Sequence, residues 1–278
     1  MSGVSTSAVA PVHVVLAVKD LLQAKTRLVG AVATEQRAAL VLAMLTDTLN
    51  AALRCPNVAA AHVVTRDREV AAAAQHCGAS VLADPEHEGL NNALQHAANV
   101  VGVRPVLALQ PDLPALRAGE LGAAITAARS QARRCFTADR DGSGTTMLIS
   151  LDDALQPLFG VDSAAQHRAS GAQPLTGSWP RLRCDVDTIA DVAAALQLGV
   201  GSATGAVLDG WGTPATVAEH ADGVIALRAD DGRTLRSTEA AAQLGGWRQL
   251  RPGQRVRVHQ DRNDTVLLLT APSSTPPG

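Results

Sequence analysis

Two aspartates, Asp185 and Asp187, lie one residue apart in the stretch "RCDVDT" (183–188). The pattern predicts the end of a short strand, on which alternate side chains point to the same face, roughly 7 Å apart along the backbone. That spacing suits metal ions about 3.5 to 4 Å apart that carboxylates and phosphate oxygens bridge. Hard oxygen ligands beside substrate phosphates indicate Mg²⁺. The structural alternative is that Asp187 caps the next helix while Asp185 pairs with Arg183, and this stretch alone favours neither interpretation.

A third acid, Asp112, lies in the stretch "LALQPDLPAL" (107–116). The pattern predicts a buried strand over 103–112, after which Leu113 and Pro114 end the strand and fix the backbone. Open α/β sheets bind ligands at the carboxyl ends of their strands, so an acid at this place is a candidate metal ligand. An aspartate in a turn beside proline is also very common, and the motif alone is weak.

Three basic residues, Lys19, Lys25 and Arg27, follow the first predicted strand, "VHVVLAV" (12–18). Cations beside a strand end can neutralise a triphosphate. The glycines of a Walker A loop are absent from this stretch. Taken alone, the stretch favours a solvated basic loop.

Two later loops contain small and hydroxyl-bearing residues. In "RDGSGTTML" (140–148), backbone N–H groups together with Ser143 and Thr145 can hold a carboxylate or a phosphate, although an ordinary hairpin turn is favoured by this stretch alone. The poorly periodic stretch "LFGVDSAAQHRASGA" (158–172) is of the kind that carries function more often than core segments do. It contains Gly160, Ser163, His167 and Arg168. No Ser/Cys–His–Asp arrangement is readable, so a covalent nucleophile is not expected.

Strands and helices alternate through about residue 200, which predicts an α/β class with a doubly wound, mostly parallel, Rossmann-like sheet. The loops described above follow strand ends of that sheet. The strands are expected at 12–18, 58–65, 79–84, 103–112, 135–139 and 145–151, and the helices at 35–54, 67–77, 90–101, 117–133 and 189–198.

The pattern changes after about residue 204 to short strands and closely spaced turns, which predicts a small all-β barrel. We expect an α/β domain at 12–204, an OB-like barrel at 213–271, and disordered tails at 1–11 and 272–278. The barrel sequence is similar to cold-shock and other five-stranded OB-type domains, which stack bases on surface aromatics. Trp247 is the only aromatic residue in it, so nucleic-acid binding is disfavoured.

Composition narrows the class of protein further. The chain has 278 residues, 46% of them hydrophobic, with a net charge of -2, which gives no electrostatic reason to expect nucleic acid or a membrane surface as the main partner. Its four cysteines form no CxxC pair, and we expect them to be reduced. No signal peptide and no apolar run long enough to span a bilayer are recognisable, so a cytoplasmic location is expected.

Together these motifs resemble one family, the guanylyltransferases that activate a phosphorylated three-carbon acid in the biosynthesis of the deazaflavin coenzyme F-420. The family includes 2-phospho-L-lactate and phosphoenolpyruvate guanylyltransferases. The resemblance covers about residues 12–202, in matching order. The stretches that carry it are "AVKDLLQAKTRL", "VLAMLTDTL", "LADPEHEGLNNAL", "LQPDLPAL", "ADRDGSGTTML", "FGVDSAAQHRASGA" and "LRCDVDTIADV". The sixth of them looks most like the phosphoenolpyruvate-using branch.

The resemblance implies roles for particular residues. The metal-binding acids would be Asp112, Asp185 and Asp187, and the cofactor Mg²⁺. The phosphorylated acid would be held by Thr145, Gly160 and Ser163. GTP would be held by Lys19, Lys25, Arg27 and Asn91, the three basic residues also having the catalytic role. One departure is Pro111, where the family often has glycine; proline lacks an N–H donor.

The reaction implied is the condensation of GTP with phosphoenolpyruvate to enolpyruvoyl-2-diphospho-5'-guanosine and pyrophosphate. The alternative substrates are 2-phospho-L-lactate and 3-phosphoglycerate, and a downstream transferase is a further candidate partner. An alternative from another class is a nucleic-acid-binding regulator that acts through the barrel. Retention of all three aspartates argues against that alternative.

Overall fold

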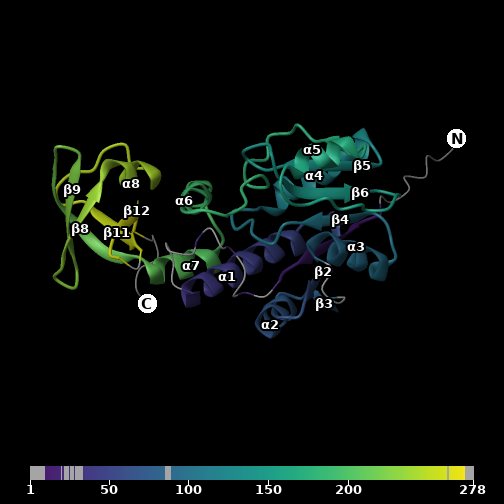
Figure 1. Cartoon of the computed structure of the whole chain (residues 1–278), viewed down its shortest axis with the longest axis horizontal. Helices are drawn as coiled ribbons and strands as arrows, with labels where there is room; N and C mark the ends of the chain where they lie inside the picture. Colours follow the sequence, from purple (N-terminus) through teal and green to yellow (C-terminus); the bar gives the residue numbers. More distant parts are fainter. Residues whose placement is uncertain are drawn as a thin grey trace, which may run out of the picture. The chain divides into compact units, whose positions relative to one another are not determined.

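The computed structural model describes residues 10–19, 21, 25, 28, 34–84, 89–261 and 263–272 (Figure 1). It divides into two compact units, each built from separate stretches of the chain. The first unit comprises Met1–Val18, Leu49–Pro111 and Arg117–Arg183. The second comprises Lys19–Thr48, Asp112–Leu116 and Cys184–Gly278. The long helix α1 (Thr34–Leu53) begins in the second unit and ends in the first.

The first unit contains a seven-stranded sheet in the order β3-β2-β1-β4-β6-β5-β7. The pairs β1–β2, β2–β3, β1–β4 and β5–β7 are parallel, while β6 runs antiparallel to β4 and β5. The predicted α/β class with a mostly parallel sheet is therefore confirmed. The strands are β1 (Val12–Ala17), β2 (Val58–Thr65), β3 (Ser80–Ala83), β4 (Val106–Leu109), β5 (Arg134–Ala138), β6 (Thr145–Ser150) and β7 (Gln173–Pro174).

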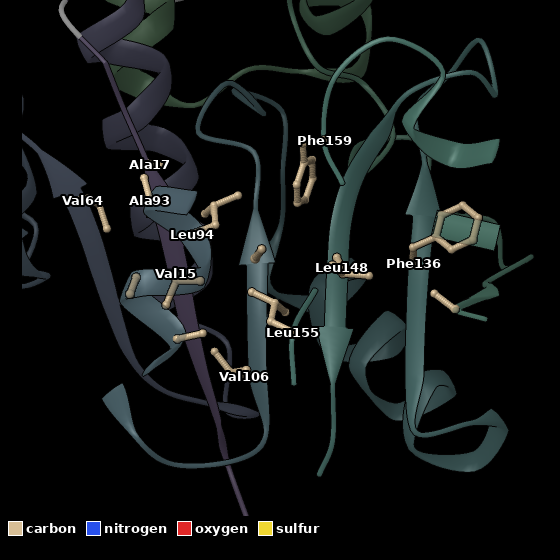
Figure 2. Packing of buried hydrophobic residues seen from close by; sticks show 14 of the residues in the cluster. Val15, Ala17, Val64, Ala93, Leu94, Val106, Phe136, Leu148, Leu155 and Phe159 are labelled. Carbon is tan, nitrogen blue, oxygen red and sulfur yellow. The ribbon is translucent and has the colours of Figure 1, made fainter. Parts of the chain in front are cut away.

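The central strands are buried on both faces. In β1, Val14, Val15 and Leu16 have no exposed surface, as expected for a strand that helices cover on both sides. On one face, side chains of α3 (Gly89–Val101) and α5 (Ser163–Ala169) join those of the five neighbouring strands β2, β1, β4, β6 and β5 in a continuous apolar cluster (Figure 2). The other helices of this unit are α2 (Arg68–His76) and α4 (Ala118–Gln131).

The stretch 158–172 is more regular than its sequence predicted. Helix α5 occupies Ser163–Ala169, and its Ala164, packed in the apolar cluster, is 1% exposed. A seven-residue helix contains too few turns for a periodic apolar pattern to be readable. Gly160, just before it, has a φ of 138°, a backbone conformation that side chains other than glycine rarely adopt.

The second unit contains α6 (Ile189–Leu198), α7 (Ser202–Trp211) and a five-stranded antiparallel sheet in the order β10-β9-β8-β11-β12. Along the chain, helix α8 (Glu239–Leu244) follows β10 and precedes β11. The edge strands β10 and β12 contact each other. This is the arrangement of a partly open five-stranded barrel, so the predicted β-barrel is confirmed, although helix α8 within it was not predicted. The strands are β8 (Thr213–Ala221), β9 (Val224–Ala229), β10 (Thr234–Thr238), β11 (Arg255–Gln260) and β12 (Val266–Thr270).

Helices α6 and α7 connect to the barrel within the second unit. Helix α6 packs against α8 and β12, and Gln197 Nε2 donates to the Leu244 carbonyl over 3.2 Å. The boundary predicted at 204–213 falls largely within helix α7. None of the helices in the described stretches combines the length and apolar character required to cross a membrane.

The strand predicted at 183–188 is wrong, because no strand is present there. The alternation on which the prediction rested is nevertheless real: Cys184 and Val186 are each 1% exposed, whereas Asp185 and Asp187 are partly exposed. Alternate burial therefore occurs here in a segment that pairs with no strand among the described residues. Helix α6 is capped by Thr188, which forms a capping box with Asp191.

Candidate active site

The first group of candidate residues lies in the second unit and is centred on Lys25. Its Nζ donates hydrogen bonds to Asp112 Oδ2 and to Asp187 Oδ1, the second over 2.8 Å. Two of the three acids predicted as metal ligands therefore bind the same residue of the predicted basic loop, Lys25.

The electrostatics of this group are those of a partly buried ion pair. The side chains of Lys25 and Asp112 are 12% and 11% exposed, and that of Asp187 is 45% exposed. Burial alone would lower the pKa of Lys25, but the two carboxylates and their hydrogen bonds outweigh it and raise that pKa well above its ordinary value. Lys25 is therefore a permanent positive charge between the two acids.

Asp112 is positioned by helix α1. The buried hydroxyl of Thr48 accepts a hydrogen bond from the Leu113 N–H over 3.0 Å and donates to the Met44 carbonyl over 2.8 Å. The residue that follows Asp112 is thus attached to a rigid helix. On the other side, the Gly201 N–H donates to the Pro114 carbonyl over 2.8 Å.

Asp47, the neighbour of Thr48, holds the start of helix α7. Its carboxylate accepts from the Ala203 N–H over 3.2 Å and from the Thr204 N–H over 2.8 Å. The carboxylate supplies acceptors for two N–H groups that no helical carbonyl can reach. A Cβ atom at Gly201 would lie 2.2 Å from this carboxylate, so any other residue there would force the Asp47 side chain to shift.

Asp112 and Asp187 offer oxygen atoms to a metal ion but do not form a complete set of ligands. Asp112 Oδ1 is buried and accepts no hydrogen bond from any described residue, so it has a lone pair available for a cation. Among the described residues, however, no three Asp, Glu, His or Cys side chains are grouped closely enough to hold a metal ion. The structure brings Asp112 and Asp187 together at Lys25 and does not assemble a three-carboxylate group with Asp185. The donor set is nevertheless hard oxygen, which fits Mg²⁺.

The second group of candidate residues lies in the first unit, around His167 of α5. The His167 ring has no exposed surface, and its Nδ1 lies 2.9 Å from Thr145 Oγ1. Its Nε2 accepts a hydrogen bond from the Leu158 N–H over 2.9 Å. Burial, aided by the positive charge of Arg134, lowers the pKa of His167 to about 4, so the ring is neutral at neutral pH.

Asn91 holds the residue that follows Leu158. Its Nδ2 donates to the Phe159 carbonyl over 3.0 Å, and its Oδ1 accepts from the Phe159 N–H over 2.7 Å. This places Asn91, which the sequence associated with the nucleotide, on the backbone just before Gly160. Ser163, 1% exposed, donates its N–H to the Gly160 carbonyl over 3.2 Å.

The other two residues of the predicted basic loop are Lys19 and Arg27. Lys19 is exposed, two residues after the end of β1. Arg27 lies outside the described residues, so its predicted role stays a prediction.

The outer face of β9 and β10 carries no aromatic side chain on which bases could stack. The outward-facing residues of these two strands are Val224, Ala226, Arg228, Thr234, Arg236 and Thr238. None is aromatic, whereas single-strand-binding barrels stack successive bases on aromatic rings.

Sequence reasoning missed the hydrogen bonds of Thr48 and Asp47 and the contact between Thr145 and His167. The sequence did contain a signal for Asp47 and Thr48, because these polar residues interrupt the apolar run "VLAMLTDTL" (41–49) of a predicted helix. Polar groups on a buried helix face require hydrogen-bond partners. The partners themselves are not readable from the sequence.

Comparison with known protein families gives one match that covers more than half of the chain. The family model described as "Guanylyl transferase CofC like" matches residues 12–172. The phosphoenolpyruvate guanylyltransferase of Mycobacterium ulcerans is 50% identical over 214 residues, covering 75% of this chain and 98% of the relative. The enzyme of the same name from Mycolicibacterium paratuberculosis is 52% identical over 199 residues, covering 69% of this chain and 90% of the relative. About a quarter of this chain thus has no counterpart in the first relative.

Solved structures share the fold at low sequence identity. A putative nucleotide-diphospho-sugar transferase from Desulfovibrio desulfuricans G20 is 17% identical with a TM-score of 0.53, covering 71% of this chain and 93% of its own. A nucleotidyl transferase from Methanothermobacter is 18% identical with a TM-score of 0.50, covering 66% and 94%. These similarities support the α/β fold of this chain.

Proposed function

Because this chain belongs to the CofC-like guanylyl transferase family, we propose that it condenses GTP with phosphoenolpyruvate. The products are enolpyruvoyl-2-diphospho-5'-guanosine and pyrophosphate. The observation that carries the choice of acid is the 50–52% identity to relatives named phosphoenolpyruvate guanylyltransferase. The proposal requires GTP and a three-carbon phospho-acid as partners, and a downstream transferase that consumes the product is a further candidate.

The chemistry is a nucleotidyl transfer. A phosphate oxygen of the acid attacks the α-phosphorus of GTP in line, a P–O bond forms, the bond to the β-phosphate breaks, and pyrophosphate takes the electron pair. No general base is required, because the attacking phosphate is already ionised at neutral pH. This is consistent with a His167 that is buried, neutral and hydrogen-bonded at both nitrogens.

The proposed roles of the site residues follow from their charge and hydrogen-bonding groups. We propose that Lys25, Lys19 and Arg27 offset negative charge on the leaving pyrophosphate, and that Thr145, Gly160 and Ser163 bind the phospho-acid. Asp112, Asp185 and Asp187 would hold Mg²⁺, which when bound supplies charge neutralisation for the phosphates. Asn91, whose side chain is bonded to the Phe159 backbone, is proposed to contribute to the nucleotide site, as the family resemblance implies.

The test is pyrophosphate release with GTP and Mg²⁺, comparing phosphoenolpyruvate, 2-phospho-L-lactate and 3-phosphoglycerate, with ATP as the nucleotide control. We expect release with GTP and phosphoenolpyruvate. Release with one of the other acids only would keep the reaction and change the substrate, while the absence of release with every acid would overturn the proposal.

Asp187→Ala supplies the site-directed arm of this test. We expect turnover to fall at least about a hundredfold with an unchanged far-UV circular dichroism spectrum. Asp231→Ala is the matched control, because Asp231 is an aspartate of the barrel paired with Arg233. Near-normal turnover of Asp187→Ala would remove Asp187 from the site.

A further inference from the structure

The hydrogen bonds of His167 have a fixed direction, and we propose that this histidine is a positioning residue that makes the Thr145 hydroxyl a donor toward the phosphorylated acid. The inference rests on the proposed function, in which Thr145 binds that acid. It assigns to the buried imidazole a role in substrate binding and none in proton transfer.

The direction follows from the backbone. A peptide N–H can only donate, so the 2.9 Å contact between the Leu158 N–H and His167 Nε2 requires a lone pair on Nε2. In a neutral imidazole the hydrogen is then on Nδ1. Nδ1–H consequently donates to Thr145 Oγ1 over 2.9 Å, and the hydroxyl is the acceptor in this pair.

A hydroxyl that accepts from His167 still has its own hydrogen to donate. Among the described residues, the hydrogen bonds of the chain give Thr145 Oγ1 no other side-chain or backbone partner. An anionic oxygen of a carboxylate or phosphate is the natural acceptor for a free O–H donor. If the Thr145 hydroxyl instead donated to His167, it would have only lone pairs left and no hydrogen to donate to an anionic oxygen.

Hydrogen bonds at both nitrogens and contacts with two aromatic rings hold the His167 ring in its orientation. The ring of Phe159 meets His167 edge-on with centroids 5.2 Å apart, and Phe136 lies on another side with centroids 5.8 Å apart. Burial and the positive charge of Arg134 disfavour an imidazolium at this position. Asn91 also holds the backbone of Phe159. The His167 ring therefore contacts both the segment before Gly160 and the Thr145 hydroxyl.

The first test reads the tautomer without reference to activity. In ¹⁵N-histidine-labelled protein, long-range ¹H–¹⁵N correlation spectra distinguish a protonated from an unprotonated ring nitrogen. We expect His167, identified by the signal missing in His167→Gln, to show Nδ1–H and a bare Nε2 from pH 6 to 8. An Nε2–H tautomer or an imidazolium in that range would overturn the inference while leaving the proposed function intact.

The second test uses two substitutions that replace one ring nitrogen each. His167→Asn keeps an amide near the position of Nδ1, and His167→Gln keeps one near the position of Nε2. We expect the dissociation constant for phosphoenolpyruvate, measured by calorimetry, to rise about tenfold in His167→Gln, the loss of roughly one hydrogen bond, and less in His167→Asn. The constant for GTP should not change. A purely structural role predicts the reverse order, because asparagine leaves the larger cavity.

Thr145→Val completes a double-mutant cycle with His167→Gln. We expect each single variant to weaken binding of the acid and the double variant to be no weaker than Thr145→Val alone. Additive effects would contradict the inference. His259→Gln is the matched control: His259 is a buried histidine of the barrel whose Nε2 lies 2.9 Å from Thr270 Oγ1, and its loss should leave binding unchanged. If the wild-type protein binds none of the three acids, the proposed function fails, and this substrate role fails with it.

Discussion

Lys25 Nζ lies 2.8 Å from Asp187 Oδ1, and the same ammonium group donates to Asp112. Two carboxylates that are far apart in the chain thus share one lysine. Like charges this close require a positive charge between them, and the lysine supplies it. Any cation that these acids bind must therefore compete with Lys25.

Replacing Lys25 tests that competition. In Lys25→Met we expect the free energy of unfolding to fall by about 1 to 3 kcal/mol without Mg²⁺, because the low-exposure carboxylate of Asp112 loses its partner. Addition of Mg²⁺ should then raise the melting temperature more in the variant than in the wild type. Lys19→Met, at an exposed lysine, is the control. An equal response to Mg²⁺ in all three proteins would show that Lys25 and the metal do not share these acids.

Two threonines of α1 form a matched pair for testing how Asp112 is held. Thr46 and Thr48 each donate to the carbonyl four residues earlier over 2.8 Å, but only Thr48 also accepts from Leu113. We expect Thr48→Val to cost about 1 to 3 kcal/mol of stability, because it leaves a buried N–H unpaired, and to weaken Mg²⁺ binding. Thr46→Val should cost much less. Urea denaturation measures the stability of the two variants, and metal titration measures their binding of Mg²⁺. Equal losses of stability in Thr46→Val and Thr48→Val would contradict the role given to Thr48.

The contact between α1 and α7 predicts a second stability effect. Asp47→Ala removes the acceptor for two N–H groups at the start of α7 and should cost about 1 to 2 kcal/mol. Gly201→Ala should destabilise the protein as well, because its Cβ would collide with the Asp47 carboxylate. In an Asp47→Ala background, Gly201→Ala should be better tolerated. Strict additivity of the two substitutions in thermal melts would argue against this contact.

His259 predicts a loss of stability in acid. Burial, aided by Arg257, lowers its pKa to about 4, so the unfolded chain binds a proton between pH 6.5 and 4 that the folded state does not. Stability must therefore fall as the pH drops through this range, by about 3 kcal/mol at pH 4 for this group. We expect the difference in unfolding free energy between wild type and His259→Gln to shrink by about 2 to 3 kcal/mol from pH 7 to 4.5. A constant difference would show that His259 does not titrate in this way.

The barrel surface predicts weak binding of nucleic acid. With no aromatic side chain on the outer face of β9 and β10, a fluorescent single-stranded oligonucleotide should give no saturable anisotropy change at physiological salt. Saturable binding that is lost in Arg228→Gln/Arg236→Gln would revive a role for the barrel in binding nucleic acid.

The sequence by itself determined the class of fold and the positions of most elements. Apolar runs such as 12–18 and the long Ala- and Leu-rich stretch that forms α1 are local patterns. Their length and periodicity indicate a strand or a helix without reference to the rest of the chain. The resemblance of ordered motifs likewise pointed to the family. The failures were mostly short elements: helices α5, α7 and α8 were not predicted, and the strand expected at 183–188 is absent.

Only the tertiary structure decided which polar groups meet. The sequence identified Lys25, Asp112 and Asp187 separately, but their hydrogen bonds join residues from distant stretches. The same holds for Thr48 with the Leu113 N–H and for Thr145 with His167. A buried polar group must find a partner, yet which partner it finds depends on how the backbone folds in space, and no local pattern encodes that.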